Sequence, residues 1–396
     1  MSWARTFGRW TLPVAVAIWA VAALPLLAGK EKEKEKEPEL DVPYVPTHDS
    51  AVEAMLKLAK VTASDYVMDL GCGDGRIVIA AAKKHKAHGL GVDLDPKRVA
   101  ESKRNAAKAG VTALVEFRKA DVMKTDVRRA NVVTLFLLEE VNVWLRPRLF
   151  AQLRPGTRVV SNSFSMRDWR PDEKVKHDKA YSQVIYFWAI PAPVGGTWTW
   201  QEKRGGKNTA GSLWLEQDFQ AVQGTVRLPG TAKATPVSKA SLAGKELSVT
   251  ASLAAGAKET VVVFRGTADG DVIRGTQEWR GGPNAGTRPW LAKRKTVDLV
   301  GRWQVRAPSH PGYHGTLRIK RAAGRLEATY LRDREPKKPL PLPAFYVWGS
   351  SVRFEVPVGE TLPLVFSGSL RPDGSGGGNV GHEESLERKL WSAKRL

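Results

Sequence analysis

Two kinds of hydrophobic pattern divide this chain near Pro193. Before it, short apolar runs such as Tyr66 to Leu70 and Val132 to Leu138 alternate with segments whose apolar residues recur at helical spacing, such as Ile77 to His85. After Pro193, the helical spacing ends, and Gly, Thr and Trp separate short alternating runs. The first pattern predicts an α/β domain with an open, mainly parallel sheet covered by helices on both faces. The second pattern predicts antiparallel strands.

The second part of the chain contains an internal repeat. Gly-Thr-Trp198-Thr-Trp matches Gly-Arg-Trp303-Gln-Val, and Trp290-Leu-Ala-Lys-Arg matches Trp391-Ser-Ala-Lys-Arg. The offset of about a hundred residues is the size of one small domain. We therefore predict two tandem antiparallel all-β units, as small up-and-down barrels, with a pair of β-sandwiches as the alternative. The matched tryptophans are expected to close the cores of these units.

The N-terminus differs from both parts. Arg5 and Arg9 precede an apolar run from Trp10 to Ala28, which is typical of a signal peptide or membrane anchor and is about long enough to span a bilayer. An alternating Lys-Glu tract and several prolines follow, and they predict a solvated tether. The predicted organisation is a signal peptide or anchor at 1–29, a charged linker at 30–43, the α/β domain at 44–193, and β repeats at 194–295 and 296–396.

Net charge and cysteine content limit the partners, disulfides and metal sites that the sequence can support. The 396-residue chain has a formal net charge of +21, which favours acidic partners or a generally basic surface and does not specifically indicate nucleic acid. Cys72 is the only cysteine, so an intramolecular disulfide and a four-cysteine zinc site are excluded. Histidine, cysteine and carboxylate residues show no ligand spacing, so no metal site is predicted.

The turn Asp69-Leu-Gly71-Cys-Gly73-Asp74-Gly75-Arg is the main candidate for a binding site. It follows an expected strand and precedes an expected helix, where backbone without Cβ can approach a ligand beside free N–H groups. Its spacing differs from the dinucleotide fingerprint, and Asp74 would repel a pyrophosphate. A cofactor with an amino-acid end fits better, with Asp69 and nearby backbone facing its ammonium and carboxylate.

Two further acids follow the next two expected strands. Asp93 ends Gly-Leu-Gly-Val-Asp, where a carboxylate can accept hydrogen bonds from both hydroxyls of a ribose. Asp121, in Lys-Ala-Asp-Val-Met, is placed to accept from an adenine amino group. Each acid alone is also explained as a strand-end cap, but three acids at three consecutive strand ends indicate a shared ligand.

These three motifs occur in the order typical of the seven-strand (class I) S-adenosylmethionine-dependent methyltransferases, which residues 44 to 190 resemble. The resemblance implies a Rossmann-like domain and S-adenosyl-L-methionine as cofactor. It also implies that Asp69, Gly71, Gly73 and Gly75 surround the methionine end of the cofactor. The match indicates the cofactor strongly and the methyl acceptor weakly.

A narrower resemblance rests on Pro-Tyr44-Val-Pro-Thr47 followed by Asp-Leu-Gly-x-Gly-Asp-Gly-Arg-Ile-Val-Ile-Ala-Ala-Ala. This pattern is similar to the small mitochondrial protein-lysine methyltransferases that act on ATP synthase c subunit and the adenine nucleotide translocase. It implies that Tyr44 and Thr47 form a lid over the methionine end, and that a protein lysine is the first candidate acceptor. The long β-rich C-terminal part departs from that family.

The sequence offers candidates for the catalytic residues but does not identify them. An Asn-Pro-Pro-Tyr-type motif does not follow the fourth expected strand, which reads Thr-Leu-Phe136-Leu-Leu-Glu139-Glu140. Glu139 or Glu140 could orient an amine, although a solvated helix start also explains them. Asn162, at the end of the fifth expected strand, is a further candidate.

Two alternatives remain. The protein could be an exported or membrane-anchored binding module whose methyltransferase-like domain is a non-catalytic scaffold, or a methyltransferase for a small molecule or lipid. The basic start favours export of the rest of the chain, whereas a cofactor made inside cells favours the cytoplasmic side. The predicted localisation is therefore membrane association through the N-terminal segment, with the side left open.

Overall fold

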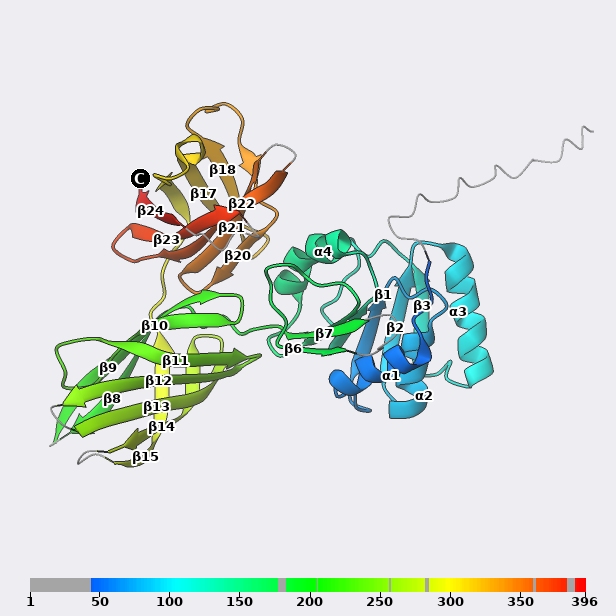
Figure 1. The fold of residues 1–396 in the computed structure, drawn as a ribbon, viewed down its shortest axis with the longest axis horizontal. Helices are drawn as coiled ribbons and strands as arrows, with labels where there is room; N and C mark the ends of the chain where they lie inside the picture. Colours follow the sequence, from blue (N-terminus) through cyan, green and yellow to red (C-terminus); the bar gives the residue numbers. More distant parts are fainter. Residues whose placement is uncertain are drawn as a thin grey trace, which may run out of the picture. The chain divides into compact units, whose positions relative to one another are not determined.

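Three β-sheets organise the chain in the computed structural model (Figure 1), which describes residues 44–176, 183–204, 206–255, 258–281, 285–358, 361–382 and 389–396. The first sheet is mixed and carries helices. The second and third are antiparallel and lie in the C-terminal part of the chain. This confirms the predicted fold class.

The first sheet has the strand order β3-β2-β1-β4-β5-β7-β6. Strands β1 to β5 pair in parallel, and β7 pairs antiparallel with both β5 and β6. The strands are β1 (Tyr66–Leu70), β2 (His88–Asp93), β3 (Val115–Lys119), β4 (Val132–Leu135), β5 (Arg158–Asn162), β6 (Glu173–Lys176) and β7 (Val184–Ala189). The chain moves outward from β1 to β3 and then returns to β4 beside β1. This reversal leaves a crevice at the carboxyl ends of β1 and β4, the usual place for a ligand in such sheets.

Helices cover both faces of this sheet because successive strand residues point to opposite sides. On one face, Val67 and Val132 pack with Met55 and Ile77 from the helices α1 and α2. On the other face, Met68, Val133 and Val159 pack with Leu145 from α4. The helices are α1 (Asp49–Leu58), α2 (Arg76–His85), α3 (Pro96–Ala109) and α4 (Glu139–Gln152).

The second sheet is a closed barrel in the order β10-β11-β12-β13-β14-β15-β8-β9. Its strands are β8 (Gly196–Arg204), β9 (Lys207–Asp218), β10 (Ala221–Arg227), β11 (Thr235–Ala243), β12 (Glu246–Ala255), β13 (Lys258–Asp269), β14 (Val272–Arg280) and β15 (Gly286–Arg294). Closure removes the exposed edges that an antiparallel sheet would otherwise present.

The third sheet has nine antiparallel strands in the order β19-β18-β17-β16-β24-β23-β22-β21-β20. Its strands are β16 (Gly301–Arg306), β17 (Gly315–Ala322), β18 (Arg325–Arg332), β19 (Leu340–Pro341), β20 (Phe345–Trp348), β21 (Ser351–Val358), β22 (Thr361–Leu370), β23 (Ser375–His382) and β24 (Lys389–Arg395), with a short 3-10 helix η1 (Pro311–Tyr313).

The repeated tryptophans occupy equivalent places in the two antiparallel sheets. Trp198 and Trp303 are fully buried, and each indole N–H donates to the carbonyl four residues earlier, at 2.8 and 3.0 Å. Arg294 and Arg395, which end the matched Trp-x-Ala-Lys-Arg segments, lie over these indoles, with guanidinium carbons 4.3 and 5.6 Å from the ring centroids. The sequence repeat is therefore also a repeat of contacts.

One prediction is corrected. Within the described part of the chain, no helix has the length and apolar character needed to cross a bilayer, and this finding overturns the predicted membrane localisation. The segment at 1–29 and the linker at 30–43, on which that prediction depended, lie outside the described residues.

Candidate active site

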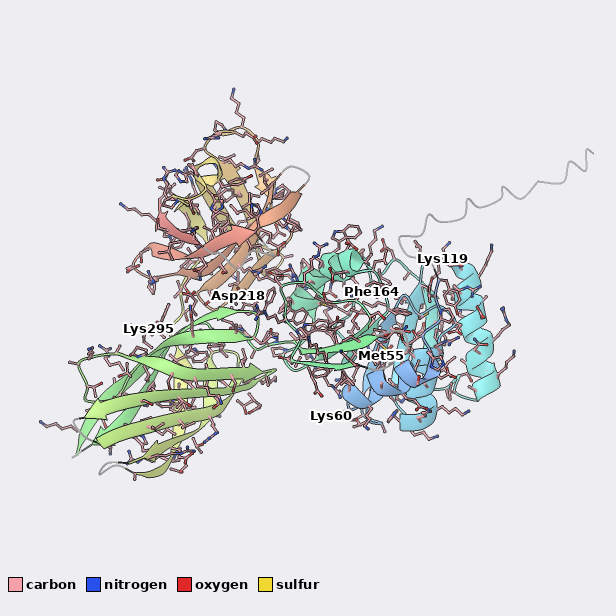
Figure 2. The ribbon with its side chains drawn as sticks, viewed as in Figure 1. Met55, Lys60, Lys119, Phe164, Asp218 and Lys295 are labelled. Carbon is pink, nitrogen blue, oxygen red and sulfur yellow. The ribbon has the colours of Figure 1, made fainter. Side chains whose placement is uncertain are left out.

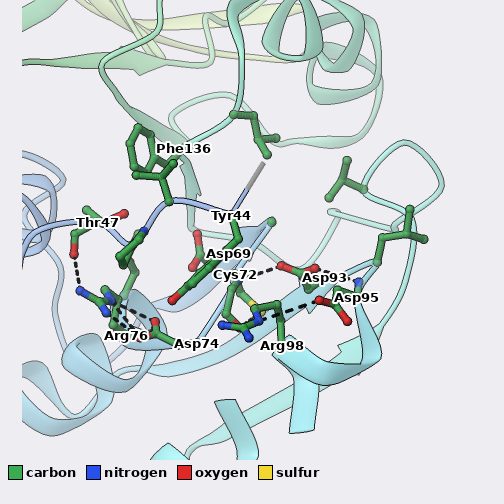
Figure 3. A pocket seen from close by; sticks show the side chains of 18 of the residues that line it. Tyr44, Thr47, Asp69, Cys72, Asp74, Arg76, Asp93, Asp95, Arg98 and Phe136 are labelled. Atoms are coloured by element: carbon green, nitrogen blue, oxygen red, sulfur yellow. Dashed lines mark hydrogen bonds and ion pairs between the residues drawn. The ribbon is translucent and has the colours of Figure 1, made fainter. Parts of the chain in front are cut away.

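A pocket of about 950 Å³, counted with the solvent at its mouth, lies at the carboxyl ends of β1, β2 and β4 (Figure 3). The sequence-predicted residues that line it are Tyr44, Thr47, Asp69, Gly71, Gly73, Asp93 and Asp121. The crevice formed where the strand order reverses therefore collects residues from segments up to 97 positions apart, from Tyr44 to Val141.

The glycine turn forms the floor of the pocket with a backbone that other residues would strain. Gly71, Gly73 and Gly75 have φ values of +84°, +52° and +83°. A Cβ on Gly71 would lie 2.7 Å from Leu137 Cδ2, and a Cβ on Gly73 would lie 2.5 Å from Tyr44 Cε2. The missing side chains thus admit both the turn and the close approach of its neighbours.

Asp93 links the end of β2 to this turn. Its Oδ2 accepts from the Gly73 backbone N–H at 2.8 Å, and its Oδ1 accepts from the Asp95 N–H at 2.9 Å. Each carboxylate oxygen has two lone pairs, so one acceptor position on each oxygen stays available for a ligand.

Asp69 is a buried carboxyl group at the base of the pocket, with 2% of its surface exposed. Burial raises the pKa of Asp69 to about 7; the hydrogen bond from Thr134 opposes this rise, and the negative charges of Asp93 and Asp74 add to it. Thr134 Oγ1 donates to Asp69 Oδ1 at 2.7 Å, and Oδ2 has no hydrogen bond to another described residue. A cationic ligand group beside Asp69 would therefore relieve an unfavourable burial.

The segment from Tyr44 to Thr47 lies across the turn and is held there by two arginines. Arg76 donates from Nη1 to the Thr47 carbonyl at 2.7 Å and from Nε to Asp74 at 3.0 Å. The Arg98 guanidinium carbon lies 4.4 Å from the centroid of the Tyr44 ring, whose other side faces Gly73. Tyr44 is thus packed between the Arg98 cation and the glycine turn.

Comparisons with known proteins agree with this geometry. The model of the ANTKMT methyltransferase domain matches residues 69–173. A protein-lysine N-methyltransferase from Saccharolobus islandicus is 44% identical over 38% of this chain and 94% of its own length. The adenine nucleotide translocase lysine N-methyltransferase of mouse is 35% identical over 39% of this chain and 66% of its own length. The chain belongs to this methyltransferase family.

A solved RNA methyltransferase from Salinibacter ruber, in complex with S-adenosyl-L-homocysteine, is 50% identical over 37% of this chain and 93% of its own, with a TM-score of 0.35. The family model and the protein-lysine N-methyltransferase relative identify the protein as an S-adenosylmethionine-dependent methyltransferase, whose cofactor is S-adenosyl-L-methionine. The comparisons lend no support to the alternative of an exported or non-catalytic scaffold.

The residues of this methyltransferase pocket fit the cofactor. Asp69 is a buried carboxyl group that an ammonium would stabilise, and Asp93 keeps two acceptor positions for a pair of hydroxyls. The turn between these acids has no Cβ atoms at Gly71 and Gly73 that would crowd a ligand. The donor and acceptor set therefore suits an amino acid joined to a nucleoside.

Two predicted residues of the methyltransferase have more local roles. Asp121 accepts from the Met123 backbone N–H at 2.8 Å and pairs with Lys124 at 3.2 Å, so it caps its own turn at the rim of the pocket. Gly75 is not among the lining residues; it begins α2, and a Cβ there would lie 2.7 Å from both Phe117 and Ser102. Close packing against β3 and α3 explains this third glycine.

Sequence reasoning missed the two arginines that contact the segment from Tyr44 to Thr47, and it missed the apolar part of the lining. Arg76 directly follows the last glycine of the turn, and Arg98 lies three residues after Asp95, with which it pairs at 3.8 Å. These spacings offered a signal because residues three apart share a helix face. The apolar lining residues Leu94, Val122, Phe136, Leu137 and Val141 follow strand ends and carry no motif of their own.

The structure does not place the three weak catalytic candidates in the pocket lining. Ser165 Oγ donates to Glu139, and Arg167 pairs with Glu139 at 3.5 Å and with Glu140 at 3.3 Å. Asn162 is 1% exposed and accepts from Ser163 Oγ at 3.3 Å. The two glutamates therefore serve the segment after β5 and do not stand open beside the cofactor site.

Proposed function

We propose that this methyltransferase transfers the methyl group of S-adenosyl-L-methionine to the side-chain amine of protein lysine. The observation that carries the proposal is the 44% identity to the protein-lysine N-methyltransferase of Saccharolobus islandicus across 94% of that protein. That match spans 151 residues of this chain and so extends well beyond the short cofactor motifs.

We assign the cofactor positions from the pocket geometry. Asp69 and the turn at Gly71 and Gly73 would hold the methionine end, Asp93 the ribose hydroxyls, and Asp121 the rim near adenine. Tyr44, with the Thr47 segment behind it, would close over the methionine end and exclude water. Gly75 would contribute indirectly, because its missing Cβ lets the turn pack closely against Phe117 and Ser102.

The acceptor side suits a long aliphatic chain with a basic end. Phe136 lines the pocket, and its ring centroid lies 6.2 Å from that of Phe164. Glu139 and Glu140 follow Phe136 by three and four residues; both pair with Arg167, but the Glu140 side chain keeps 56% of its surface exposed and adds negative charge near the acceptor side. The methyl donor, when bound, supplies a sulfonium that is already a good leaving group, so the residues act mainly by aligning the amine and excluding water.

The test uses the full chain with isotopically labelled S-adenosyl-L-methionine and an RNase-treated bacterial protein extract. A matched sample of the extract has its lysines blocked by acetic anhydride, and bulk RNA forms a third sample. We expect label on the untreated proteins, recovery of methyl-lysine after acid hydrolysis, and no label on the blocked proteins. The Asp93→Ala variant serves as the control with an impaired cofactor site.

Each other result replaces the proposal with a specific alternative. Label that survives lysine blocking would indicate another protein acceptor, and label on RNA would indicate an RNA methyltransferase. Label only in the organic phase of an extract would indicate a lipid or small molecule. No label in a protein that binds S-adenosyl-L-homocysteine would contradict lysine as the acceptor.

A further inference from the structure

A cluster of charged side chains lies buried at the junction of the three sheets. It consists of Arg146 on α4, Asp168 after β5, Asp218 at the end of β9, and Arg353 and Glu355 on β21. Asp218 is labelled in Figure 2. Both arginines are fully buried. We call these five residues the junction cluster.

Asp168 is the centre of the junction cluster because both arginines bind it. Arg146 Nη1 donates to Asp168 Oδ1 at 2.7 Å, and Arg353 Nη2 donates to Asp168 Oδ2. Arg146 Nη2 also donates to Glu355 Oε1 at 2.7 Å, and Arg353 Nη1 lies 3.5 Å from Asp218 Oδ1. The catalytic domain and both antiparallel sheets are thus joined through one carboxylate and its partners.

The cation Arg353 is out of water, so its charge depends on these partners. Its guanidinium carbon lies 4.8 Å from the centroid of the Phe219 ring, over which Arg146 also lies at 5.3 Å. Buried pairs of arginine and carboxylate favour one placement of the two side chains, because a shifted carboxylate would leave the buried arginine without a counter-charge.

Asp168 lies in the loop 163–172 between β5 and β6, and the first part of this loop, residues 163–168, adjoins the acceptor side of the pocket. Asn142 Nδ2 donates to the carbonyls of Phe164 and Ser165 at 3.2 and 3.3 Å. Ser165 binds Glu139 on the first turn of α4, and Phe164 packs near the pocket residue Phe136. The loop therefore carries contacts from Asp168 to the rim of the pocket.

The backbone of this loop is strained at two residues. Ser163 and Arg167 have φ values of +65° and +52°, which side chains with a Cβ seldom adopt. Such a conformation persists only where the surroundings hold it. On either side of Arg167, the arginines of the junction cluster hold the loop: both bind Asp168, and Arg146 Nη1 also donates to the Met166 carbonyl at 3.2 Å.

We propose that Arg353 and Glu355 of the third sheet are positioning residues for methyl transfer: through Asp168 and Arg146 they hold the 163–168 loop in the shape that receives the acceptor. The C-terminal β units then complete the acceptor side of the active site and leave the cofactor side untouched. The inference builds on the proposed function for the acceptor, but its first readout does not depend on the acceptor's identity.

The test compares three full-length variants by amide hydrogen exchange and by binding of S-adenosyl-L-homocysteine. Arg353→Met removes the cation, and Glu355→Gln removes one charge but keeps an acceptor for Arg146. Arg294→Met is the matched control, because Arg294 is also a buried arginine of the β units, and its described bonds go to Pro193, Gly195, Gly270 and Asp271, none of which belongs to the junction cluster.

We expect faster exchange in residues 163–168 for Arg353→Met and, to a smaller extent, for Glu355→Gln. Exchange in the glycine turn and binding of S-adenosyl-L-homocysteine should stay unchanged, and Arg294→Met should leave the loop unchanged. With lysine-containing extract proteins as the acceptor, kcat/KM should fall about 10- to 100-fold in Arg353→Met, since small displacements of aligned groups cost that much. Arg353→Lys, which keeps the positive charge, should retain part of the kcat/KM that Arg353→Met loses.

Two results overturn the proposal. One is unchanged exchange in residues 163–168 in folded Arg353→Met, or in Glu355→Gln if the first variant does not fold. The other is equal loosening of the loop and the glycine turn in Arg353→Met and Arg294→Met, which would show general destabilisation. If the wild-type chain methylates RNA instead of lysine, the proposed function fails, while the exchange measurement still decides the positioning role.

Discussion

Replacing Asp93 by alanine tests the site assignment most directly. In the free protein, the two oxygens of Asp93 accept from the backbone N–H groups of Gly73 and Asp95 at 2.8 and 2.9 Å. One further acceptor position on each oxygen is the basis for assigning the ribose hydroxyls to this residue. Asp93→Ala removes all four acceptor positions without adding bulk.

The expected loss follows from two hydrogen bonds. A hydrogen bond to a charged group contributes about 1.5 to 3 kcal/mol, so two would contribute about 3 to 6 kcal/mol. Water can enter the space in the variant and satisfy the hydroxyls, which favours the lower end. Because about 1.4 kcal/mol corresponds to a tenfold change in affinity, we expect the Kd for S-adenosyl-L-homocysteine to rise about 100-fold.

Isothermal calorimetry with S-adenosyl-L-homocysteine measures this change, and a thermal melt reports the accompanying loss of stability. Asp126→Ala is the control, because Asp126 is a half-exposed aspartate whose hydrogen-bond partner is Arg128. Asp93→Asn adds a second test, because its side chain keeps a single oxygen and can accept only part of these hydrogen bonds. Its affinity for S-adenosyl-L-homocysteine should lie between those of Asp93→Ala and Asp126→Ala.

An Asp93→Ala protein that is folded and binds S-adenosyl-L-homocysteine as tightly as the wild type would refute the assignment. An equal loss in Asp126→Ala would refute the reasoning differently, because it would trace the effect to net charge and not to the pocket. A loss of affinity that follows the loss of thermal stability across all three variants would point to the turn and not to the ribose contact.

Three further predictions follow from the same pocket. Gly73→Ala should lower stability and cofactor affinity more than Gly110→Ala, because both glycines have positive φ but only Gly73 would place its Cβ 2.5 Å from Tyr44; thermal melts and calorimetry compare them. Because burial raises the pKa of Asp69 to about 7 and an ammonium favours its charged form, affinity for S-adenosyl-L-homocysteine should fall as the pH drops below about 7, with proton release on binding. Calorimetry in buffers of different ionisation enthalpy should show this, and a slope that persists in Asp69→Asn would contradict it. Burial and the nearby carboxylates raise the pKa of the Cys72 thiol, so iodoacetamide should leave it intact until the chain is unfolded; modification in the native state, seen by mass spectrometry, would contradict this.

The hydrophobic periodicity predicted strands and helices correctly where only one kind of element could explain the pattern. The apolar run at Tyr66–Leu70 is β1 because both of its faces are covered, and such a strand reads as continuously apolar. The repeat predicted two antiparallel units because each contains the same buried tryptophan and arginine pair, such as Trp198 with Arg294. That the first unit closes as a barrel depends on pairing between β8 and β15, which local pattern does not encode.

The cofactor side of the site was readable because its motifs are local. Asp69 lies near the end of β1, the glycines lie in the turn that follows, and Asp93 ends the neighbouring parallel strand β2, so their meeting follows from sheet geometry. Arg98 could not be assigned because its partner, the Tyr44 ring, is 54 residues away and the contact depends on how α3 packs. Glu139 and Glu140 were open candidates until the structure placed Arg167 against them.

The sequence by itself indicated the catalytic class of this protein, because a short glycine turn and three strand-end acids reproduce motifs typical of S-adenosylmethionine-dependent methyltransferases. Only the tertiary structure decided what the C-terminal β units touch. Arg353 is 185 residues from Asp168, and nothing in the local pattern of either residue indicates the other. Buried ion pairs of this kind arise where separately predictable units pack together, and their partners are chosen by the packing and not by the spacing along the chain.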